Sequence, residues 1–299
     1  MNRLEASCAG VKLKNPILTA SGTFGFGREY AKYNDLSMLG GICSKGLTLN
    51  GSKGNKGIRI WESPSGMLNS IGLENPGVDY FVNTEFNNMK NYDTAIIVNL
   101  GGHSLEDYIE GAEKLNSIDC DMIELNISCP NVKNGGMAFG IREEDVLFIT
   151  KEIKAVSKHK IMVKLSPNAH DIVKTALAAQ EGGADAVSLI NTIQAMAIDI
   201  VSKKAVFNNA YAGLSGPAIK PIALRMVHQV AKAVDIDVCG IGGIMSANDV
   251  IEFIMAGASA VQIGAGNFVD PCLSVKVVND LLAYTEKENI TIADIKGII

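Results

Sequence analysis

The stretch 248–264, NDVIEFIMAGASAVQIG, contains the pattern on which the fold depends. Its first part is spaced as an amphipathic helix and stops at Gly257, a residue that suits a left-handed helix end. After a joint of small residues comes Ala260–Gly264, a short apolar run typical of a buried parallel strand. The stretch 171–191, DIVKTALAAQEGGADAVSLIN, repeats this order with Gly182 and Gly183 at the helix end. A repeated helix–glycine–strand unit indicates an α/β fold.

Short apolar runs that close on a polar residue or a glycine recur along the whole chain. Amphipathic segments separate most of them, including one that Ser104 opens in a capping-box pattern and one over Glu143–Ser157. Eight strands alternating with helices in 299 residues predict a closed (β/α)8 TIM barrel, as one domain over residues 1–299, with an open doubly wound sheet as the alternative. The predicted strands are Ile17–Ser21, Gly41–Lys45, Ala95–Asn99, Met122–Asn126, Ile161–Lys164, Ala186–Asn191, Asp237–Gly242 and Ala260–Gly264.

Two long intervals interrupt this rhythm. One runs from Lys45 to Asn99 and contains a strand pattern around Trp61, and the other runs from Asn191 to Gly242 and contains Lys203 and Lys204. Both are too long for simple connections. We therefore expect inserted strands and loops that cover the carboxyl-terminal mouth of the barrel.

The composition limits the classes of protein to consider. A net charge of −5 without a block of Lys or Arg argues against nucleic acid as the main partner. No signal segment and no apolar run of membrane-spanning length is present, so a cytoplasmic protein without a membrane partner is expected. The six cysteines contain no Cys-x-x-Cys and the four histidines show no ligand spacing, which argues against a metal or iron–sulfur site in this chain.

Ligands of a barrel bind where its strands end, so the strand-end residues are the first candidates for a site. They are rich in amides and include Lys45 and Lys164, which favours an anionic ligand with many hydrogen-bonding groups. The glycines of the segment 240–243, with Gly264 and Ala265 after the last strand, would let a phosphate approach backbone N–H groups; tight turns are the alternative. No G-x-G-x-x-G or Walker pattern supports a Rossmann-type dinucleotide site.

The most distinctive motif is Asn126-Ile-Ser-Cys-Pro-Asn131, directly after the fourth predicted strand. Cys129 is expected to be partly exposed there, where thiolate chemistry is feasible, whereas Cys43, Cys120 and Cys239 are better explained as small buried residues. A second motif, 65–75 (SGMLNSIGLEN), is either a plain glycine-rich loop or part of a lid that carries Asn69 over the mouth.

Together these motifs resemble class 1 dihydroorotate dehydrogenases, most closely the NAD-linked type. The matching segments occur in order over nearly the whole chain: NPILTASGTFGFG, SKGLTL, GMLNSIGLENPG, ELNISCPNVKNGG, VKLSPN, LINT, GLSGPAIKP, GIGGI and VQIGAGNF. The fumarate-using homodimeric type differs at NVKNGG and GLSGPAIKP. The quinone-linked type uses serine as its base and carries an N-terminal extension.

The resemblance implies an FMN-binding barrel that oxidises (S)-dihydroorotate to orotate in de novo pyrimidine biosynthesis. Cys129 would be the general base that removes the proton at C5 while hydride leaves C6 for the flavin. Lys45 would contact flavin and substrate, and Lys164 would place positive charge beside the flavin. Other expected FMN contacts are Ser21, Gly46, Asn99, Asn126, Ile190 and Gly216, with Gly242, Gly243, Gly264 and Ala265 at the phosphate. Expected substrate contacts are Asn69, Ser70, Ile71, Gly72, Leu73, Asn126, Asn131, Asn191 and Thr192.

The NAD-linked type also implies a separate electron-transfer subunit that carries FAD and a [2Fe–2S] cluster. We accordingly expect a homodimeric catalytic core within a heterotetramer. Three other interpretations remain: the fumarate-dependent type, a Schiff-base aldolase that uses Lys164 or Lys45, and a non-catalytic barrel serving as an interaction subunit.

Overall fold

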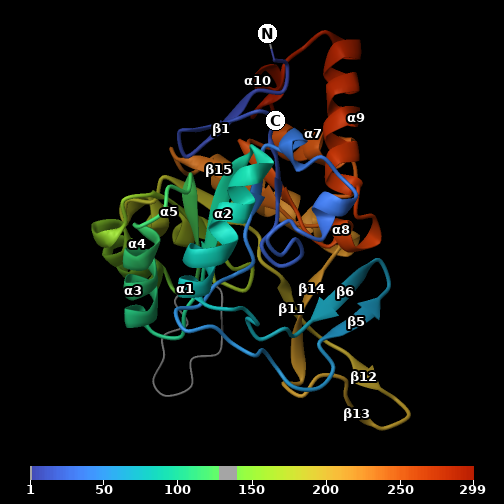
Figure 1. Ribbon diagram of the computed structural model, residues 1–299. Coiled ribbons are helices and arrows are strands. Elements are labelled where there is room, and N and C mark those ends of the chain that lie inside the picture. The colour runs from blue at the N-terminus through green and yellow to red at the C-terminus, as the bar shows by residue number, and fades with distance from the viewer. Residues whose placement is uncertain (1, 128–139) are drawn as a thin grey trace.

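A closed barrel of eight parallel strands forms the centre of the molecule (Figure 1). The computed structural model describes residues 2–127 and 140–299. Each barrel strand pairs with the next barrel strand along the chain, and the last closes on the first. The open-sheet alternative is therefore wrong, and all eight predicted strands are confirmed. They are β3 (Ile17–Thr19), β4 (Gly41–Cys43), β7 (Ala95–Leu100), β8 (Met122–Asn126), β9 (Lys160–Lys164), β10 (Ala186–Leu189), β15 (Asp237–Ile241) and β16 (Ala260–Ile263).

Helices surround the barrel and cover its outer face. The longer ones are α3 (Leu105–Leu115), α4 (Glu143–Val156), α5 (Ile172–Glu181), α6 (Lys220–Ala231), α7 (Ala247–Met255) and α9 (Leu273–Glu288). The segment 78–89, which holds α1 (Val78–Tyr80) and α2 (Phe86–Met89), covers the barrel between β4 and β7, and α8 (Gly266–Val269) and α10 (Ile292–Ile295) are single turns. No helix in the described ranges is long and apolar enough to cross a bilayer.

The predicted helix ends are confirmed with one difference. Gly183 and Gly257 have φ of +92° and +108°, the left-handed geometry expected after α5 and α7. Ser104 caps α3 by accepting a hydrogen bond from the Asp107 N–H, as the capping pattern predicts. The reciprocal bond of the Asp107 carboxylate, however, comes from the His103 N–H and not from the Ser104 N–H.

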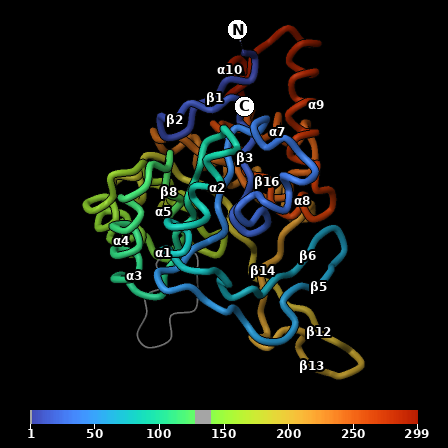
Figure 2. Tube along the Cα trace, viewed as in Figure 1, coloured from blue at the N-terminus to red at the C-terminus, as the bar shows by residue number. Residues whose placement is uncertain are grey.

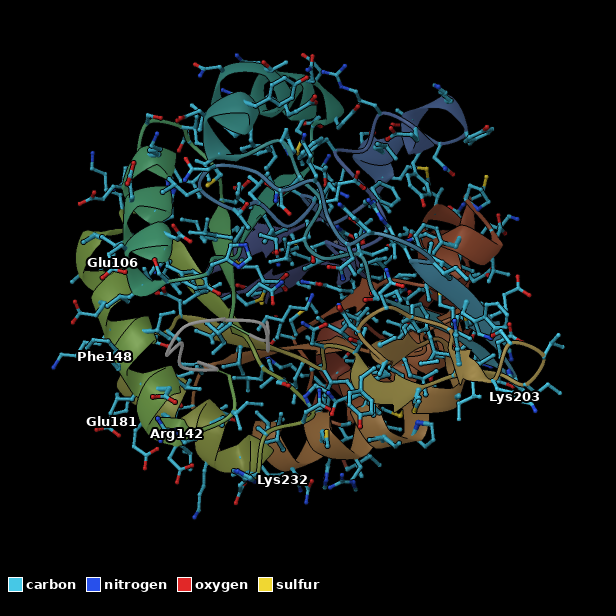
Figure 3. The ribbon with its side chains drawn as sticks, turned by 90° about the horizontal axis from the view of Figure 1, so that it is seen from below. Glu106, Arg142, Phe148, Glu181, Lys203 and Lys232 are labelled. Carbon is cyan, nitrogen blue, oxygen red and sulfur yellow. The ribbon has the colours of Figure 1, made fainter. Side chains whose placement is uncertain are left out.

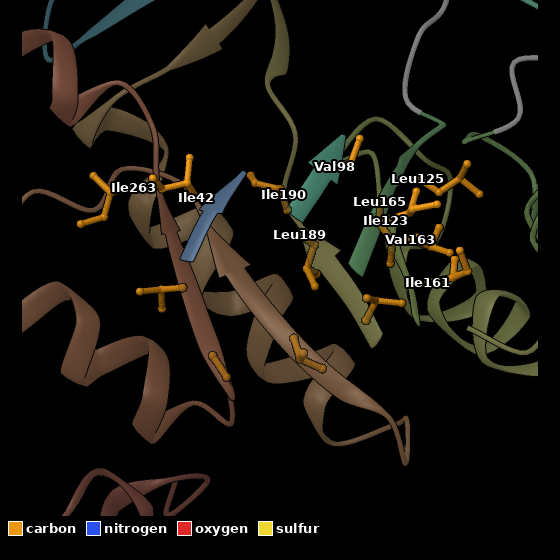
Figure 4. Packing of buried hydrophobic residues seen from close by; sticks show 14 of the residues in the cluster. Ile42, Val98, Ile123, Leu125, Ile161, Val163, Leu165, Leu189, Ile190 and Ile263 are labelled. Carbon is orange, nitrogen blue, oxygen red and sulfur yellow. The ribbon is translucent and has the colours of Figure 1, made fainter. Parts of the chain in front are cut away.

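The alternation of side chains along the strands divides the core into two parts. Outward residues such as Ile123, Leu125, Ile161 and Val163 pack beneath the helices (Figure 4). The inward residues alternate with them and fill the barrel with a lower apolar layer that includes Ile97, Met122, Met162, Ala186 and Cys239. One inward step further along five of the strands stand buried polar residues, which lie under the mouth, the barrel end formed by the carboxyl ends of the strands. They are Asn99, Glu124, Lys164, Ser188 and Gln262.

The two ends of the barrel are closed differently. The hairpin of β1 (Ala6–Cys8) and β2 (Val11–Leu13) packs on the lower apolar layer. Both chain termini lie at that end (Figure 2), where the Ile292 N–H donates to the Arg3 carbonyl.

Over the mouth lies a four-stranded antiparallel sheet, which we call the inserted sheet, built from both long intervals. It contains β5 (Ile60–Ser63), β6 (Gly66–Asn69), β11 (Ile193–Met196) and β14 (Tyr211–Ser215). The predicted strand around Trp61 is thus confirmed. The hairpin β12–β13 (Ile198–Asp199 and Lys204–Ala205) extends beyond the sheet. In the view from below, Lys203 at its turn lies at the opposite edge of the molecule from Glu106 on α3 (Figure 3).

Candidate functional site

A cavity of about 750 Å³ lies between the carboxyl ends of the barrel strands and the inserted sheet. One wall of the cavity is formed by the strand ends of the barrel. The opposite wall includes Met67 of β6, Gln194 of β11 and Tyr211 of β14. Its volume is in the range of small-molecule sites, about 300–1,000 Å³. The expectation that the two long intervals cover the mouth is therefore confirmed.

Every predicted site residue within the described ranges lines this one cavity. The geometry brings these residues together but does not test which group each would contact, so their roles remain predictions. Cys129 and Asn131 lie outside the described residues. The lining residues in question are Ser21, Lys45, Gly46, Asn69, Ser70, Ile71, Gly72, Leu73, Asn99, Asn126, Lys164, Ile190, Asn191, Thr192, Gly216, Gly242, Gly243, Gly264 and Ala265.

Beneath the cavity lies a buried carboxylate that the sequence reasoning missed. Glu124 of β8 is fully buried, and its Oε2 accepts from Asn99 Nδ2 at 2.5 Å and pairs with Lys164 Nζ at 3.3 Å. Its Oε1 accepts from Gln262 Nε2 at 2.6 Å and from Ser188 Oγ at 2.8 Å. Burial opposes ionisation, but Lys164 and these hydrogen bonds together hold the pKa of Glu124 below its usual range. The interior of the barrel therefore carries an ionised carboxylate.

An amide chain, which we define as Asn99, Asn126 and Asn191, runs from this carboxylate across the mouth. Asn126 Nδ2 donates to Asn99 Oδ1, and Asn191 Nδ2 donates to Asn126 Oδ1, each over a long 3.4 Å. Asn191 Oδ1 accepts from the Thr192 N–H at 2.8 Å. Since every member also lines the cavity, the chain orients the amide groups that a ligand would meet.

The segment 69–73 is held over the cavity by asparagines on both sides. Asn69 Nδ2 donates to the Gly213 carbonyl of β14, and Asn75 Nδ2 donates to the Leu73 carbonyl. Asn55 donates from its N–H to the Ile71 carbonyl and from Nδ2 to both the carbonyl and the Oγ of Ser70. These bonds favour the lid interpretation of the motif over a plain surface loop.

At another side of the cavity, three glycines let neighbouring backbone segments pack closely together, which a larger residue at these positions would prevent. Gly216, Gly242 and Gly243 have φ of +102°, +134° and +72°. A Cβ at Gly243 would lie 2.8 Å from the Lys220 N and 2.9 Å from the Gly216 O. Lys220 Nζ in turn bonds Asp249 Oδ1 at 2.5 Å, and Asp249 Oδ2 accepts from the Met245 N–H at 2.8 Å. This network fixes the turn after β15.

The buried cysteines cannot act as thiolate bases. Burial, with smaller effects of nearby acidic groups, raises the pKa of Cys8 and of Cys120 to about 12 and raises the pKa of Cys43 and of Cys239 well above the ordinary value. The interpretation of Cys43, Cys120 and Cys239 as small core residues is confirmed. Cys272 is half-buried near Tyr33, and its Sγ is 3.9 Å from the Tyr33 carbonyl.

These features fit a phosphate-bearing, planar, hydrogen-bonding ligand such as FMN. The glycine turns line the cavity beside the last two barrel strands, where barrels commonly bind a phosphate through backbone N–H groups. Lys45 and Lys164 supply cations, and the amides Asn99 and Asn126 supply donors and acceptors. Fold and site together define a (β/α)8 barrel whose mouth holds a cavity with the lysines and amides that suit an anionic ligand.

Comparison with known proteins is more specific. The family model described as dihydroorotate dehydrogenase matches residues 3–284, so the chain belongs to the dihydroorotate dehydrogenase family. Among its relatives are proteins named "Dihydroorotate dehydrogenase B (NAD(+)), catalytic subunit". The one from Petrotoga mobilis is 52% identical and covers 99% of both chains. Those from Thermoanaerobacter pseudethanolicus and Brachyspira hyodysenteriae are 54% and 51% identical, covering 99% and 100% of this chain and 97% and 98% of theirs.

Proposed function

We propose that the chain is the FMN-containing catalytic subunit of an NAD-linked dihydroorotate dehydrogenase, which oxidises (S)-dihydroorotate to orotate for pyrimidine biosynthesis. The observation that carries the proposal is the convergence of the predicted residues on one cavity in a chain that matches relatives of that name over its full length. FMN, when bound, supplies the hydride acceptor.

The residues of the cavity divide between cofactor and substrate. The glycines Gly242, Gly243 and Gly264, with Ala265, would hold the FMN phosphate, and the lysines would place positive charge where negative charge develops. The lid residues Asn69–Leu73 and the amides of the mouth would hold dihydroorotate, whose ring and carboxylate need both donors and acceptors. The inserted sheet covers the mouth and limits the access of water.

Cys129 is proposed as the base that takes the C5 proton. In the sequence it stands three residues after Asn126, the last residue of β8, within the motif on which its role is predicted. An ordinary cysteine thiol has a pKa of about 8.5, so the site must favour the thiolate, and an approach close to the lysines of the cavity would do so.

The electrons would leave through a partner. The relatives are named as catalytic subunits of an NAD(+) enzyme, which supports a separate electron-transfer subunit for this chain as well. We propose that this subunit carries FAD and a [2Fe–2S] cluster, and that two copies of each chain form a cytoplasmic heterotetramer. The same names favour the NAD-linked type over the fumarate-dependent type. The aldolase and the non-catalytic interpretations gain no support from the family match.

The test is the acceptor profile of the purified chain loaded with FMN. With dihydroorotate we expect rapid reduction of a dye that accepts electrons directly from flavins, and slow reduction of NAD⁺ and of fumarate. Addition of the partner subunit is expected to make NAD⁺ reduction fast. Rapid NAD⁺ reduction by the chain alone would contradict the partner requirement, fast use of fumarate would establish the other type, and no turnover with any acceptor would refute the proposed function.

A further inference from the structure

Glu124 accepts hydrogen bonds from several polar side chains under the cavity, but it does not itself line the cavity. It is fully buried in the barrel interior, and its hydrogen-bond partners come from β4, β7, β9, β10 and β16. A buried charge is costly, and it is retained only with partners such as these. The mechanism proposed above does not use this carboxylate, so its presence calls for a role.

The two oxygens of Glu124 face different groups. Oε2 bonds Asn99 Nδ2 and Lys164 Nζ, which both line the cavity, and it also accepts from the buried Cys43 Sγ at 3.4 Å, which does not line it. Oε1 bonds Ser188 Oγ and Gln262 Nε2, which lie inside the barrel and do not line it. Variants can therefore separate the effect toward the cavity from the effect on the barrel core.

An ionised carboxylate fixes the direction of the amide chain because it can only accept hydrogen bonds. Asn99 must present its NH₂ to Glu124, and its Oδ1 consequently faces Asn126. The same order passes from Asn126 to Asn191, whose Oδ1 accepts from the Thr192 N–H. A neutral amide at position 124 could donate as well as accept, and Asn99 would lose its single orientation.

The carboxylate also balances charge. Its Oε2 lies 3.3 Å from Lys164 Nζ, in an interior where charges interact strongly. The net charge that this pair presents to a bound flavin is therefore much smaller than that of a lysine alone.

We propose that Glu124 is a positioning residue of the reaction, which sets the donor and acceptor order of Asn99, Asn126 and Asn191 and balances the charge of Lys164 beneath the cofactor. This inference rests on the proposed function, and it adds a residue that touches neither substrate nor cofactor.

The experiment compares the variant Glu124→Gln, which keeps the side-chain size, with Ser188→Ala, which removes one donor to Oε1 and keeps the charge. The readouts are the dissociation constant of orotate from the FMN-loaded chain, the reduction potential of the bound flavin, and the unfolding temperature. For Glu124→Gln we expect orotate to bind about tenfold more weakly, which is about 1.4 kcal/mol. We also expect a reduction equilibrium shifted about tenfold toward the reduced flavin, about 30 mV for a two-electron couple. Ser188→Ala should change the orotate dissociation constant and the reduction equilibrium each by less than about twofold. Of the three readouts it should lower only the unfolding temperature.

A second pair of variants keeps the inference testable if Glu124→Gln does not fold, because Glu124→Gln with Lys164→Met leaves no lone buried charge. Relative to Lys164→Met alone, the double variant should bind orotate more weakly, since the amide order is lost, and should show a higher reduction potential, since a negative charge beneath the flavin is removed. Glu124→Gln with wild-type orotate affinity and potential would overturn the inference, as would Ser188→Ala with equal effects. A wild-type chain that binds neither FMN nor orotate would refute the proposed function itself.

Discussion

Replacing Gly243 by alanine tests whether the turn after β15 is a phosphate cradle. Gly243 has φ +72°, where an L-residue pays about 1–2 kcal/mol. Its Cβ would lie 2.8 Å from the Lys220 N and 2.9 Å from the Gly216 O. Both are backbone atoms, so no rotamer change relieves the contact and the turn itself must move.

The net cost follows from these opposing effects. Strain and contact together exceed the ~0.4–1 kcal/mol that alanine gains by restricting the unfolded chain. We expect about 2 kcal/mol of destabilisation, which lowers the unfolding temperature of the FMN-free protein by about 4–8 °C. Because the backbone N–H groups of the turn move with it, FMN should bind at least about tenfold more weakly.

The assay combines thermal unfolding of the FMN-free chain with titration of FMN by fluorescence. Gly101→Ala is the matched control: its Cβ would have no neighbour closer than 3.7 Å, its φ is not positive, and it does not line the cavity. Its unfolding temperature and FMN affinity should be close to wild type. Wild-type FMN affinity in Gly243→Ala would refute the assignment of this turn to the phosphate.

Three further predictions address other parts of the account. Gly213→Ala would place a Cβ 2.1 Å from Thr192 Oγ1 and so displace that side chain. The KM for dihydroorotate should therefore rise about tenfold while FMN affinity stays unchanged. An unchanged KM would contradict the assignment of Thr192 to the substrate site. Asp185→Asn weakens the ion pairs to Lys154 and Lys160 and the bond from the Ile161 N–H, and it should cost about 1 kcal/mol, or about 2–4 °C, in thermal unfolding without affecting orotate binding. Burial opposes ionisation of Asp249, but Lys220 and the Met245 N–H lower its pKa from 3.8. The contribution of Asp249 to stability is therefore present above pH 3.8 and is lost as the pH falls through the lower folded pKa. Asp249→Asn should flatten this part of the curve of unfolding temperature against pH, and an unchanged curve would contradict the role of the network.

The barrel and the cavity lining could be predicted because both depend on local patterns. Each buried parallel strand is a short apolar run, and several of these runs end on an inward polar residue, such as Asn126 or Lys164, that lines the cavity. Parallel pairing sets Asn126 opposite Lys164, which brings strand ends from distant parts of the sequence to one edge. The chemistry of the strand ends was therefore readable without knowledge of the packing.

What escaped prediction depends on contacts between distant segments. The inserted sheet pairs β6 with β14, about 145 residues apart, and neither strand shows a pattern that specifies the other. Asn55 and Asn75 hold the lid by donating hydrogen bonds to carbonyl groups, which any side chain with a donor group in a loop can do. Glu124 was concealed within an apolar strand, although its alternation with Met122 and Asn126 places it inside the barrel and is the signal that could have revealed it.

The most direct test of the central claim is anaerobic addition of dihydroorotate to the FMN-loaded chain, followed by the loss of flavin absorbance. Rapid bleaching is expected in the wild-type protein, with orotate formed in equal amount. In Cys129→Ala we expect retained FMN and a severely slowed reduction, by about 10²-fold or more, because a general base is removed. A wild-type flavin that stays oxidised, or a Cys129→Ala variant that bleaches at the wild-type rate, would contradict the central claim.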